Sequence, residues 1–198
     1  MLCSGNTPAL STELLLTAYK QGIFPMADAD GRVGWYTADP RAVFPLEAIH
    51  PNARFRRFLR SACFRFTIDE AFEEVIGQCA SSHGDTWISP ELEEAYIALH
   101  HSGHAHSVET WAGDELVGGI YGVHIGAAFF GESMFSAVPN ASKAAFYKLV
   151  EHLRQRGFTL FDSQFINDHT ALLGAVEVPK AEYLVRLRKA LEVEVGFL

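Results

Sequence analysis

Hydrophobic residues recur at helical spacing in several stretches of the chain, next to residues that commonly begin or end helices. Near the N-terminus, Leu14, Leu15 and Ala18 form one apolar stripe behind a capping Ser11. Further along, Asp69 precedes another such stripe and is predicted to cap it. These patterns predict six helices, at about residues 11–22, 51–61, 69–79, 89–103, 142–156 and 181–191.

Alternation of apolar and polar residues with a period of two predicts several strands. Three of them form a meander, joined by turns at 113–114 and 124–126. The predicted strands cover residues 64–68, 105–111, 115–123, 127–134 and 158–163. This order of elements predicts an α+β fold in which helices flank a mostly antiparallel sheet.

Residues 23–45 contain Pro25, Pro40 and Pro45, which predict an irregular, extended connection. We place a boundary near residue 38. The sequence then divides into a small N-terminal domain, 1–38, and a main domain, 39–198.

The chain has 198 residues, of which 48% are hydrophobic and 20% charged, so we expect a packed core rather than disorder. Fifteen Phe residues predict bulky core layers or a pocket for an apolar group. Cys3, Cys63 and Cys79 lack a CxxC spacing, and neither a signal-peptide pattern nor an apolar run of membrane-spanning length is present. These features predict a cytoplasmic protein with free thiols and no membrane association.

The formal net charge is −8, but the basic residues are unevenly distributed. Five Arg and no acidic residue lie between residues 50 and 66. Such a stretch indicates either a local site for a polyanion or a solvated helix face that lacks acids. The pattern alone leaves both interpretations open.

Eight short segments lie between residues 18 and 175. Taken together and in order, they identify a protein family far more specifically than any one of them does. The segments are AYKQGIFP (18–25), DPRAV (39–43), TWI (86–88), GHAHSVE (103–109), ELVGGIYGV (115–123), FGESMFS (130–136), NASK (140–143) and DSQFINDHTALLGA (162–175). Together they resemble the leucyl/phenylalanyl-tRNA–protein transferase family, in the family's own order.

This resemblance implies a small N-terminal domain followed by a domain like that of the GCN5-related N-acetyltransferases. It implies transfer of Leu or Phe, and Met less well, from aminoacyl-tRNA to proteins that begin with Arg or Lys. The modified proteins would then enter N-end-rule degradation. The resemblance implies no metal and no cofactor, and we expect a monomer.

The resemblance assigns catalysis to Asp162 and Gln164, which lie two residues apart at a strand end and so point to one face. We hypothesise that Gln164 accepts a hydrogen bond from the attacking amine, while Asp162 fixes the Gln164 amide and favours a nearby cation. Without the family, two such residues are more typical of strand-end hydrogen bonding to the backbone. Glu132 corresponds to the acceptor-peptide site, where a carboxylate suits an N-terminal Arg.

For the donor amino acid, the resemblance implies an apolar pocket made by Ile120, Phe129, Phe146, Leu149, Leu153 and Phe161. The three helical members recur at i, i+3 and i+7, a stripe that on its own is more often plain core, although a pocket can be cut into that core. For the 3′ end of the tRNA it implies Met26, Trp35, Tyr36, Trp87 and Tyr96. Met26 stands where some family members carry a Trp. The phosphates of the tRNA would contact Arg56, Arg57 and Arg60.

Other patterns favour structural roles or competing functions. His100, His101, His104 and His106, with Cys79 and His83 nearby, match no standard zinc spacing. Gly118, Gly119 and Gly122 form no phosphate-binding motif and predict close strand packing. An acyl-CoA-dependent N-acetyltransferase is the main alternative, yet the segment before the long helix, 137–143, lacks a pyrophosphate loop. A non-catalytic tRNA-binding module would not need two acids, Glu132 and Asp162, in an apolar cleft.

Overall fold

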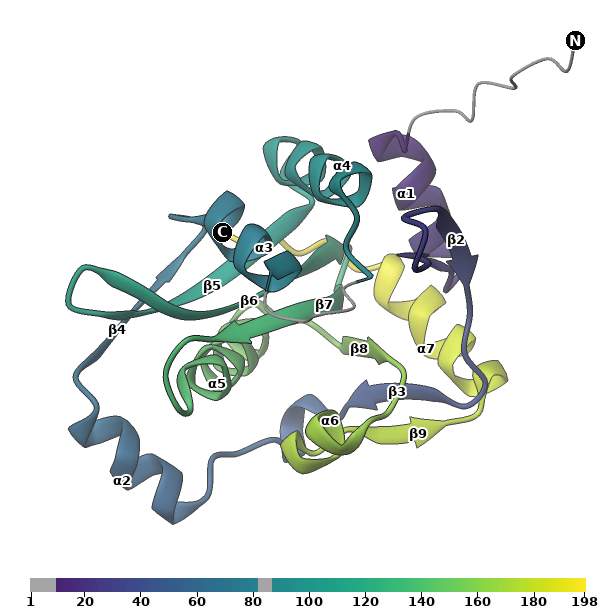
Figure 1. The fold of residues 1–198 in the computed structure, drawn as a ribbon. Helices are drawn as coiled ribbons and strands as arrows, with labels where there is room; N and C mark the ends of the chain where they lie inside the picture. The colour runs from purple at the N-terminus through teal and green to yellow at the C-terminus, as the bar shows by residue number, and fades with distance from the viewer. Residues whose placement is uncertain (1–9, 82–86) are drawn as a thin grey trace, which may run out of the picture.

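The computed structural model describes residues 10–81 and 87–198, and all six predicted helices are present in it (Figure 1). The six-residue helix α6 was not predicted. Its Asn167 accepts a hydrogen bond from the backbone of Thr170, whose side chain bonds back to the Asn167 backbone. The helices are α1 (Thr12–Lys20), α2 (Ala53–Ser61), α3 (Phe72–Ser81), α4 (Pro90–His101), α5 (Ala141–Arg156), α6 (Asp168–Leu173) and α7 (Lys180–Leu191), with a 3-10 turn η1 (Leu46–Ala48).

Helix α3 begins at Phe72, three residues later than predicted, because Asp69 does not cap it. Asp69 has a left-handed backbone with φ of 58°. Its carboxylate accepts hydrogen bonds from the backbone nitrogen of Ser107 at 2.8 Å and pairs with His106 at 2.6 Å. The carboxylate therefore joins the end of one strand to its neighbour instead of starting a helix.

Seven strands form one sheet in the order β4-β5-β6-β7-β8-β3-β9, and β1 and β2 form a separate hairpin. Every neighbouring pair is antiparallel except β7 and β8, which are parallel and are connected through α5. The predicted mostly antiparallel α+β fold is confirmed. The strands are β1 (Phe24–Ala27), β2 (Val33–Tyr36), β3 (Arg41–Phe44), β4 (Phe64–Ile68), β5 (Ala105–Ala112), β6 (Glu115–Ile125), β7 (Ala128–Ser136), β8 (Leu160–Gln164) and β9 (Val176–Val178).

The prediction of an irregular connection at 23–45 was wrong. This segment contributes the β1–β2 hairpin and then β3, which pairs with β8 on one side and β9 on the other. Each of these strands has at most four residues, too few to show a period in the sequence. β1 and β2 are strands because they pair with each other in a local hairpin, whereas β3 is a strand because it pairs with strands distant in the sequence.

Helices cover both faces of the main sheet and enclose a core on each. One core lies beneath α1, α3, α4 and α7, and the other lies beneath α5 (Figure 1). Glycines in β6 permit close packing, between strands as predicted at Gly122 and against helix α5 at Gly118. A Cβ at Gly118 would lie 2.6 Å from Ala141 Cβ, and one at Gly122 would lie 2.2 Å from the Phe130 carbonyl oxygen.

Candidate active site

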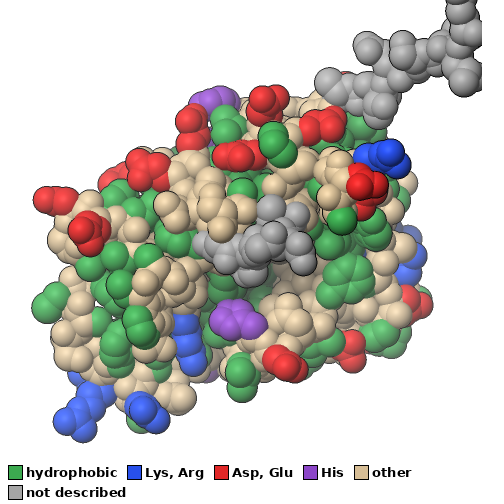
Figure 2. All heavy atoms as spheres, viewed as in Figure 1, with side chains coloured by type: hydrophobic (Ala, Val, Ile, Leu, Met, Phe, Trp, Pro, Cys, Tyr) green, Lys and Arg blue, Asp and Glu red, His purple; other side chains and the backbone are tan. Residues whose placement is uncertain are grey.

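A cavity of about 610 Å³ opens where the two parallel strands part. Strands β7 and β8 are paired from Ala128↔Leu160 to Phe130↔Asp162. The residues that follow on both strands, from Gly131 on β7 and from Ser163 on β8, line the cavity. Figure 2 shows the corresponding hollow near the centre of this face, with hydrophobic atoms in its floor. The sheet thus supplies side chains from two diverging strands to one space.

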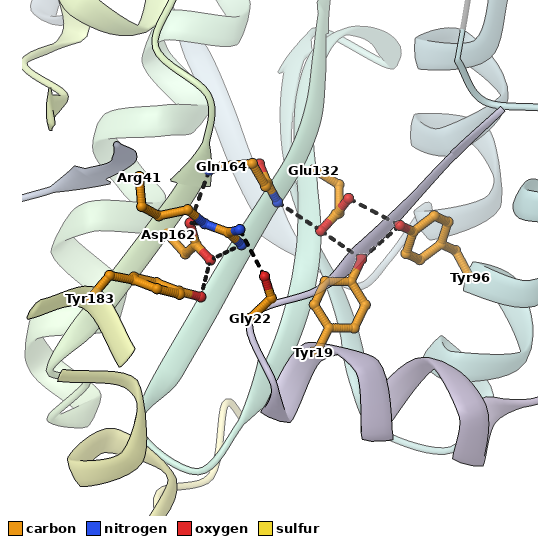
Figure 3. Close-up of polar contacts among 8 residues, drawn as sticks. All are labelled: Tyr19, Gly22, Arg41, Tyr96, Glu132, Asp162, Gln164 and Tyr183. Atoms are coloured by element: carbon orange, nitrogen blue, oxygen red, sulfur yellow. Dashed lines mark hydrogen bonds and ion pairs between the residues drawn. The ribbon is translucent and has the colours of Figure 1, made fainter. Parts of the chain in front are cut away.

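Glu132 occupies a bulge in β7. Tyr121 pairs with Ser133 and Gly122 with Gly131, so Glu132 is the extra residue in the ladder. Its carboxylate accepts hydrogen bonds from three side chains (Figure 3). They come from the hydroxyls of Tyr19 at 2.8 Å and Tyr96 at 3.0 Å, and from the amide nitrogen of Gln164 at 3.1 Å.

The pKa of Glu132 is raised to about 7, chiefly because burial disfavours the charged carboxylate. The hydrogen bonds from Tyr19 and Tyr96 and the charge of Arg41 oppose this effect, while the nearby Asp162 adds to it. A cation that binds beside such a buried carboxylate stabilises its charged form more than it would stabilise an exposed carboxylate.

Asp162 lies behind the cavity and is fully buried, with 0% of its surface exposed. Arg41 binds it through two hydrogen bonds, Nε to Oδ1 at 2.9 Å and Nη2 to Oδ2 at 2.7 Å. The hydroxyl of Tyr183 donates to Oδ2 at 2.6 Å. Because Arg41 already pairs with this carboxylate and closes it off, Asp162 does not line the cavity.

Gln164 lines the cavity and adopts a left-handed backbone with φ of 56°. Its backbone nitrogen donates to Asp162 Oδ1 at 2.9 Å, and its amide nitrogen donates to Glu132. Our expectation that Asp162 fixes the Gln164 amide directly was wrong. Asp162 holds the backbone of Gln164, and Glu132 orients its amide.

The apolar side of the cavity contains two of the six predicted pocket residues, Ile120 and Phe161. Phe44 and Met134 line it as well. The other four predicted residues are buried in the core beneath α5 and are absent from the cavity lining: Phe129, Phe146, Leu149 and Leu153. The helical stripe packs against the sheet, so in this structure it supports the pocket from behind.

Of the residues predicted at the tRNA 3′ end, Met26 and Trp87 line the cavity. Trp35 and Tyr36 lie on β2, paired with Pro25 and Phe24, and are 41% and 40% exposed. Tyr96 does not reach the cavity. It faces inward from α4, is fully buried and bonds to Glu132, which corrects its predicted place.

Arg56, Arg57 and Arg60 are exposed on α2, whose Phe55 is buried against Tyr147 of α5 with ring centroids 5.2 Å apart. Figure 2 shows basic side chains at the lower left, where α2 lies, and acidic side chains along the upper rim, where α3 and α4 lie. On this face, the basic cluster of α2 is therefore separate from the acidic side chains of α3 and α4.

All four clustered histidines have structural contacts. His101 lies 3.7 Å from the Glu73 carboxylate, and the His104 ring hydrogen-bonds with the backbone oxygen of His124. His106 pairs with Asp69 and stacks on Phe197 at 4.1 Å, and His100 stacks on Phe72 at 4.3 Å. Across 10–81 and 87–198, no group of three or more His, Cys, Asp or Glu side chains is arranged to hold a metal ion. In the same residues, no helix is long and apolar enough to cross a membrane.

Some residues singled out from the sequence lie outside the described residues: Cys3, His83 and Thr86. Cys63 is a free, exposed thiol, and Cys79 is free and buried. Burial raises the pKa of the Cys79 thiol to about 12, so this cysteine is protonated at neutral pH.

Comparison with known proteins decides the family. The model described as "Leucyl/phenylalanyl-tRNA protein transferase" matches residues 43–188, and the model of that family's N-terminal domain matches residues 9–39. The chain belongs to the leucyl/phenylalanyl-tRNA–protein transferase family. It is therefore an enzyme, an aminoacyltransferase.

Curated members of the leucyl/phenylalanyl-tRNA–protein transferase family match nearly the whole chain. The one from Gloeobacter violaceus is 51% identical over 95% of this chain and 97% of its own length. The one from Rubrobacter xylanophilus is 49% identical over 95% of this chain and 98% of its own length. A solved structure of a conserved protein of unknown function from Bacteroides thetaiotaomicron is far less similar. It has 8% identity and a TM-score of 0.47, and covers 91% of this chain and 64% of that one.

Several residues that contribute to the site were missed from the sequence, among them Tyr19, Arg41, Phe44, Met134 and Tyr183. Three of them, Tyr19, Arg41 and Met134, lie inside the motifs that carry the family resemblance, so those motifs held the signal. Phe44 follows one motif directly, and Tyr183 lies outside them all. Nothing local in the sequence connects Tyr183 to Asp162, its hydrogen-bond partner in the structure.

Proposed function

We propose that this aminoacyltransferase moves Leu or Phe, and Met less well, from charged tRNA onto the N-terminal Arg or Lys of proteins. One observation carries the proposal. An apolar surface and a carboxylate with a raised pKa open into the same cavity, and the Gln164 amide lies at its wall beside that carboxylate. Such a space suits an apolar acyl group and a cationic acceptor together.

In the transfer, the α-amine nitrogen of the acceptor attacks the ester carbonyl carbon of the aminoacyl-tRNA. A C–N bond forms, and the C–O bond to the terminal ribose breaks. The amine loses a proton and the ribose oxygen gains one, so atoms and charges balance without another reactant. An N-terminal amine has a pKa of about 7.7–8.0, so part of it is already unprotonated near neutral pH. Positioning alone is worth roughly 7–11 kcal/mol in such reactions.

Gln164 supplies the positioning. Its amide nitrogen donates to Glu132, which leaves its carbonyl oxygen available. Among the described residues, none donates a hydrogen bond to that oxygen, and the residue lines the cavity. The oxygen accepts a hydrogen bond from the attacking amine and directs its lone pair at the ester. A neutral amide is too weak a base to take the proton itself.

Glu132 holds the cationic end of the acceptor. Its carboxylate has about four lone-pair positions, of which Tyr19, Tyr96 and Gln164 use three. The remaining position accepts from the guanidinium of Arg or the ammonium of Lys. Binding such a cation lowers the pKa of Glu132 and removes the cost of keeping it charged while buried.

The donor occupies the other side of the cavity. Ile120, Phe161, Phe44 and Met134 contact the apolar side chain of the amino acid. Met26 and Trp87 cover the terminal adenosine, and the exposed rings on β2 extend that surface. The arginines of α2 contact phosphates further along the tRNA, which adds affinity without dependence on tRNA sequence.

We also propose the remaining features that the resemblance implies. The match of the N-terminal family model to residues 9–39 supports a small N-terminal domain, 1–38, ahead of a main domain, 39–198. The mixed sheet with one diverging parallel pair supports a GCN5-related fold for the latter. The enzyme works in the cytoplasm as a monomer, without a cofactor, and its products enter N-end-rule degradation.

The decisive experiment measures transfer of radiolabelled Leu or Phe from charged tRNA to a protein that begins with Arg. The same protein beginning with Gly is the matched acceptor control. We expect label on the first protein only. Labelled acetyl-CoA is tested in parallel, and acetylation without transfer from either tRNA would establish the alternative acetyltransferase activity and refute this proposal.

A further inference from the structure

We infer that Arg41 and Tyr183 are positioning residues for aminoacyl transfer, because they hold the Asp162 carboxylate that sets the backbone of Gln164. The inference rests on the proposed role of Gln164 in orienting the acceptor amine. Neither residue lines the cavity, so neither is expected to touch a substrate. Their effect is transmitted through Asp162 and then through Gln164.

The carboxylate of Asp162 is held from several directions. Arg41 binds both of its oxygens, at 2.9 and 2.7 Å, and the Tyr183 hydroxyl donates to Oδ2 at 2.6 Å. Oδ1 in turn accepts the Gln164 backbone N–H at 2.9 Å (Figure 3). All of these groups are buried, so water does not compete for the bonds.

The restraint matters because of the backbone conformation of Gln164. Its φ of 56° is left-handed, a conformation that residues other than glycine rarely adopt unless their surroundings impose it. The bond from its N–H to Asp162 is one such restraint. If Asp162 turned, Gln164 would relax toward an ordinary conformation and its amide would leave Glu132. The amine would then lose its hydrogen-bond acceptor.

Arg41 extends the same restraint to the donor side of the cavity. Its Nη1 donates to the Gly22 carbonyl oxygen at 2.9 Å, just before β1 begins. Its guanidinium lies between the rings of Phe24 and Tyr183, 4.7 and 4.6 Å from their centroids. Phe24 lines the cavity beside Met26. One side chain therefore ties the wall on β1 to the residue that orients the amine.

The pKa of Arg41 reflects the same arrangement. Burial lowers it, but the charge and hydrogen bonds of Asp162 outweigh burial and raise it overall. Burial and the charge of Asp162 both raise the pKa of the Tyr183 hydroxyl. Arg41 is thus charged and Tyr183 is a neutral donor throughout the pH range of the reaction.

Tyr183→Phe tests the inference with the smallest change, the loss of one hydroxyl. We expect kcat to fall about tenfold, as for loss of a hydrogen bond to a charged group, while KM for aminoacyl-tRNA changes less than twofold. Tyr121→Phe is the matched control. Tyr121 is as deeply buried, and its hydroxyl has no hydrogen-bond partner among the described residues. It should keep wild-type kcat, and thermal melting should show both variants folded at the assay temperature.

A double variant distinguishes positioning from a general structural effect. If Tyr183 acts through Gln164, Tyr183→Phe should cause no further loss of kcat in a Gln164→Ala background. Arg41→Lys, which keeps the charge but loses the two-pronged bond, serves if Tyr183→Phe melts too low. It should likewise cause no further loss of kcat in the Gln164→Ala background, whereas the loss of its bond to Gly22 beside β1 should raise KM for aminoacyl-tRNA. An undiminished tenfold loss in the Gln164→Ala background, or an equal loss in Tyr121→Phe, would overturn the inference. Failure of the wild type to transfer Leu or Phe would instead count against the proposed function.

Discussion

The Gln164 amide nitrogen donates a hydrogen bond to Glu132 Oε1 at 3.1 Å, and this bond joins two strands that have just parted. The two residues are 32 positions apart in the chain. In the proposed mechanism, Glu132, which would hold the acceptor cation, thus also orients Gln164, which would direct the acceptor amine. The proposal therefore makes acceptor selection and acceptor alignment parts of one hydrogen-bonded unit.

Removing the amide of Gln164 should reduce transfer without abolishing it. Gln164→Ala is expected to lower kcat/KM for an Arg-starting acceptor about 10–100-fold, since only positioning is lost. Gln164→Glu keeps an oxygen acceptor, so at low pH its kcat/KM should fall less than that of Gln164→Ala. The fall in kcat/KM of Gln164→Glu should grow as pH rises, because a second carboxylate beside Glu132 becomes charged. Steady-state kinetics between pH 6 and 8 checks both variants, and a 10⁴-fold loss in Gln164→Ala would indicate general-base catalysis instead.

The raised pKa of Glu132 predicts a pH-dependent affinity for the acceptor. With a pKa of about 7, Glu132 loses its charge as the pH falls below neutrality, so binding of a cationic acceptor should weaken as pH falls and strengthen as it rises. Affinity for an N-acetylated Arg peptide, which has no α-amine to titrate, should be about tenfold weaker at pH 6 than at pH 8. Calorimetric titration measures it.

Two variants control this experiment. Glu132→Gln should bind the peptide weakly and lose the pH dependence, because the titrating charge is gone. Glu151→Gln, an exposed acid on α5 outside the main cavity, should bind and titrate like the wild type. A pH dependence that survives in Glu132→Gln would assign the titration to another group.

The arginines of α2 should contribute to tRNA affinity through phosphate contacts. Replacing Arg56, Arg57 and Arg60 with Ala should raise KM for whole aminoacyl-tRNA and flatten its dependence on salt. It should leave a minimal aminoacyl-adenosine donor nearly unaffected. The matched control replaces three exposed basic residues of α7, Arg186, Arg188 and Lys189, which removes the same charge elsewhere. Equal losses with both donors would mean that α2 supports the fold.

The cavity lining predicts which residues select the donor. Ile120→Ala enlarges the lining and should change the ratio of kcat/KM for Leu-tRNA and Phe-tRNA by roughly tenfold in favour of Phe. Leu153→Ala removes a core residue behind the lining. It should lower the free energy of unfolding by about 2–5 kcal/mol and leave that ratio within twofold. A larger change of the ratio in Leu153→Ala would mean that the pocket reaches the α5 stripe, as the resemblance implied.

Much of the fold could be predicted from local patterns. Six of the helices and the strands of the meander were predicted because each presents a repeated apolar face of its own. The short strands β3 and β9 were not, since their hydrogen-bond partners are distant in the sequence. The local β1–β2 hairpin was missed because each of its strands has only four residues. Asp69 shows the same limit at one residue. Aspartate is a residue type that favours helix caps, but the carboxylate of Asp69 instead binds the backbone nitrogen of Ser107 and the ring of His106.

The sequence by itself determined the family and part of the residues from which the site is built, because the order of motifs along the chain can be read without the fold. Only the tertiary structure decided where those residues lie and what they contact. Asp162 is enclosed by Arg41 and Tyr183, Tyr96 bonds to Glu132, and four pocket residues lie in the core. The physical reason is the parting of β7 and β8. Which side chains face the resulting cavity depends on where two strands diverge, and that divergence comes from packing between distant elements rather than from a local pattern.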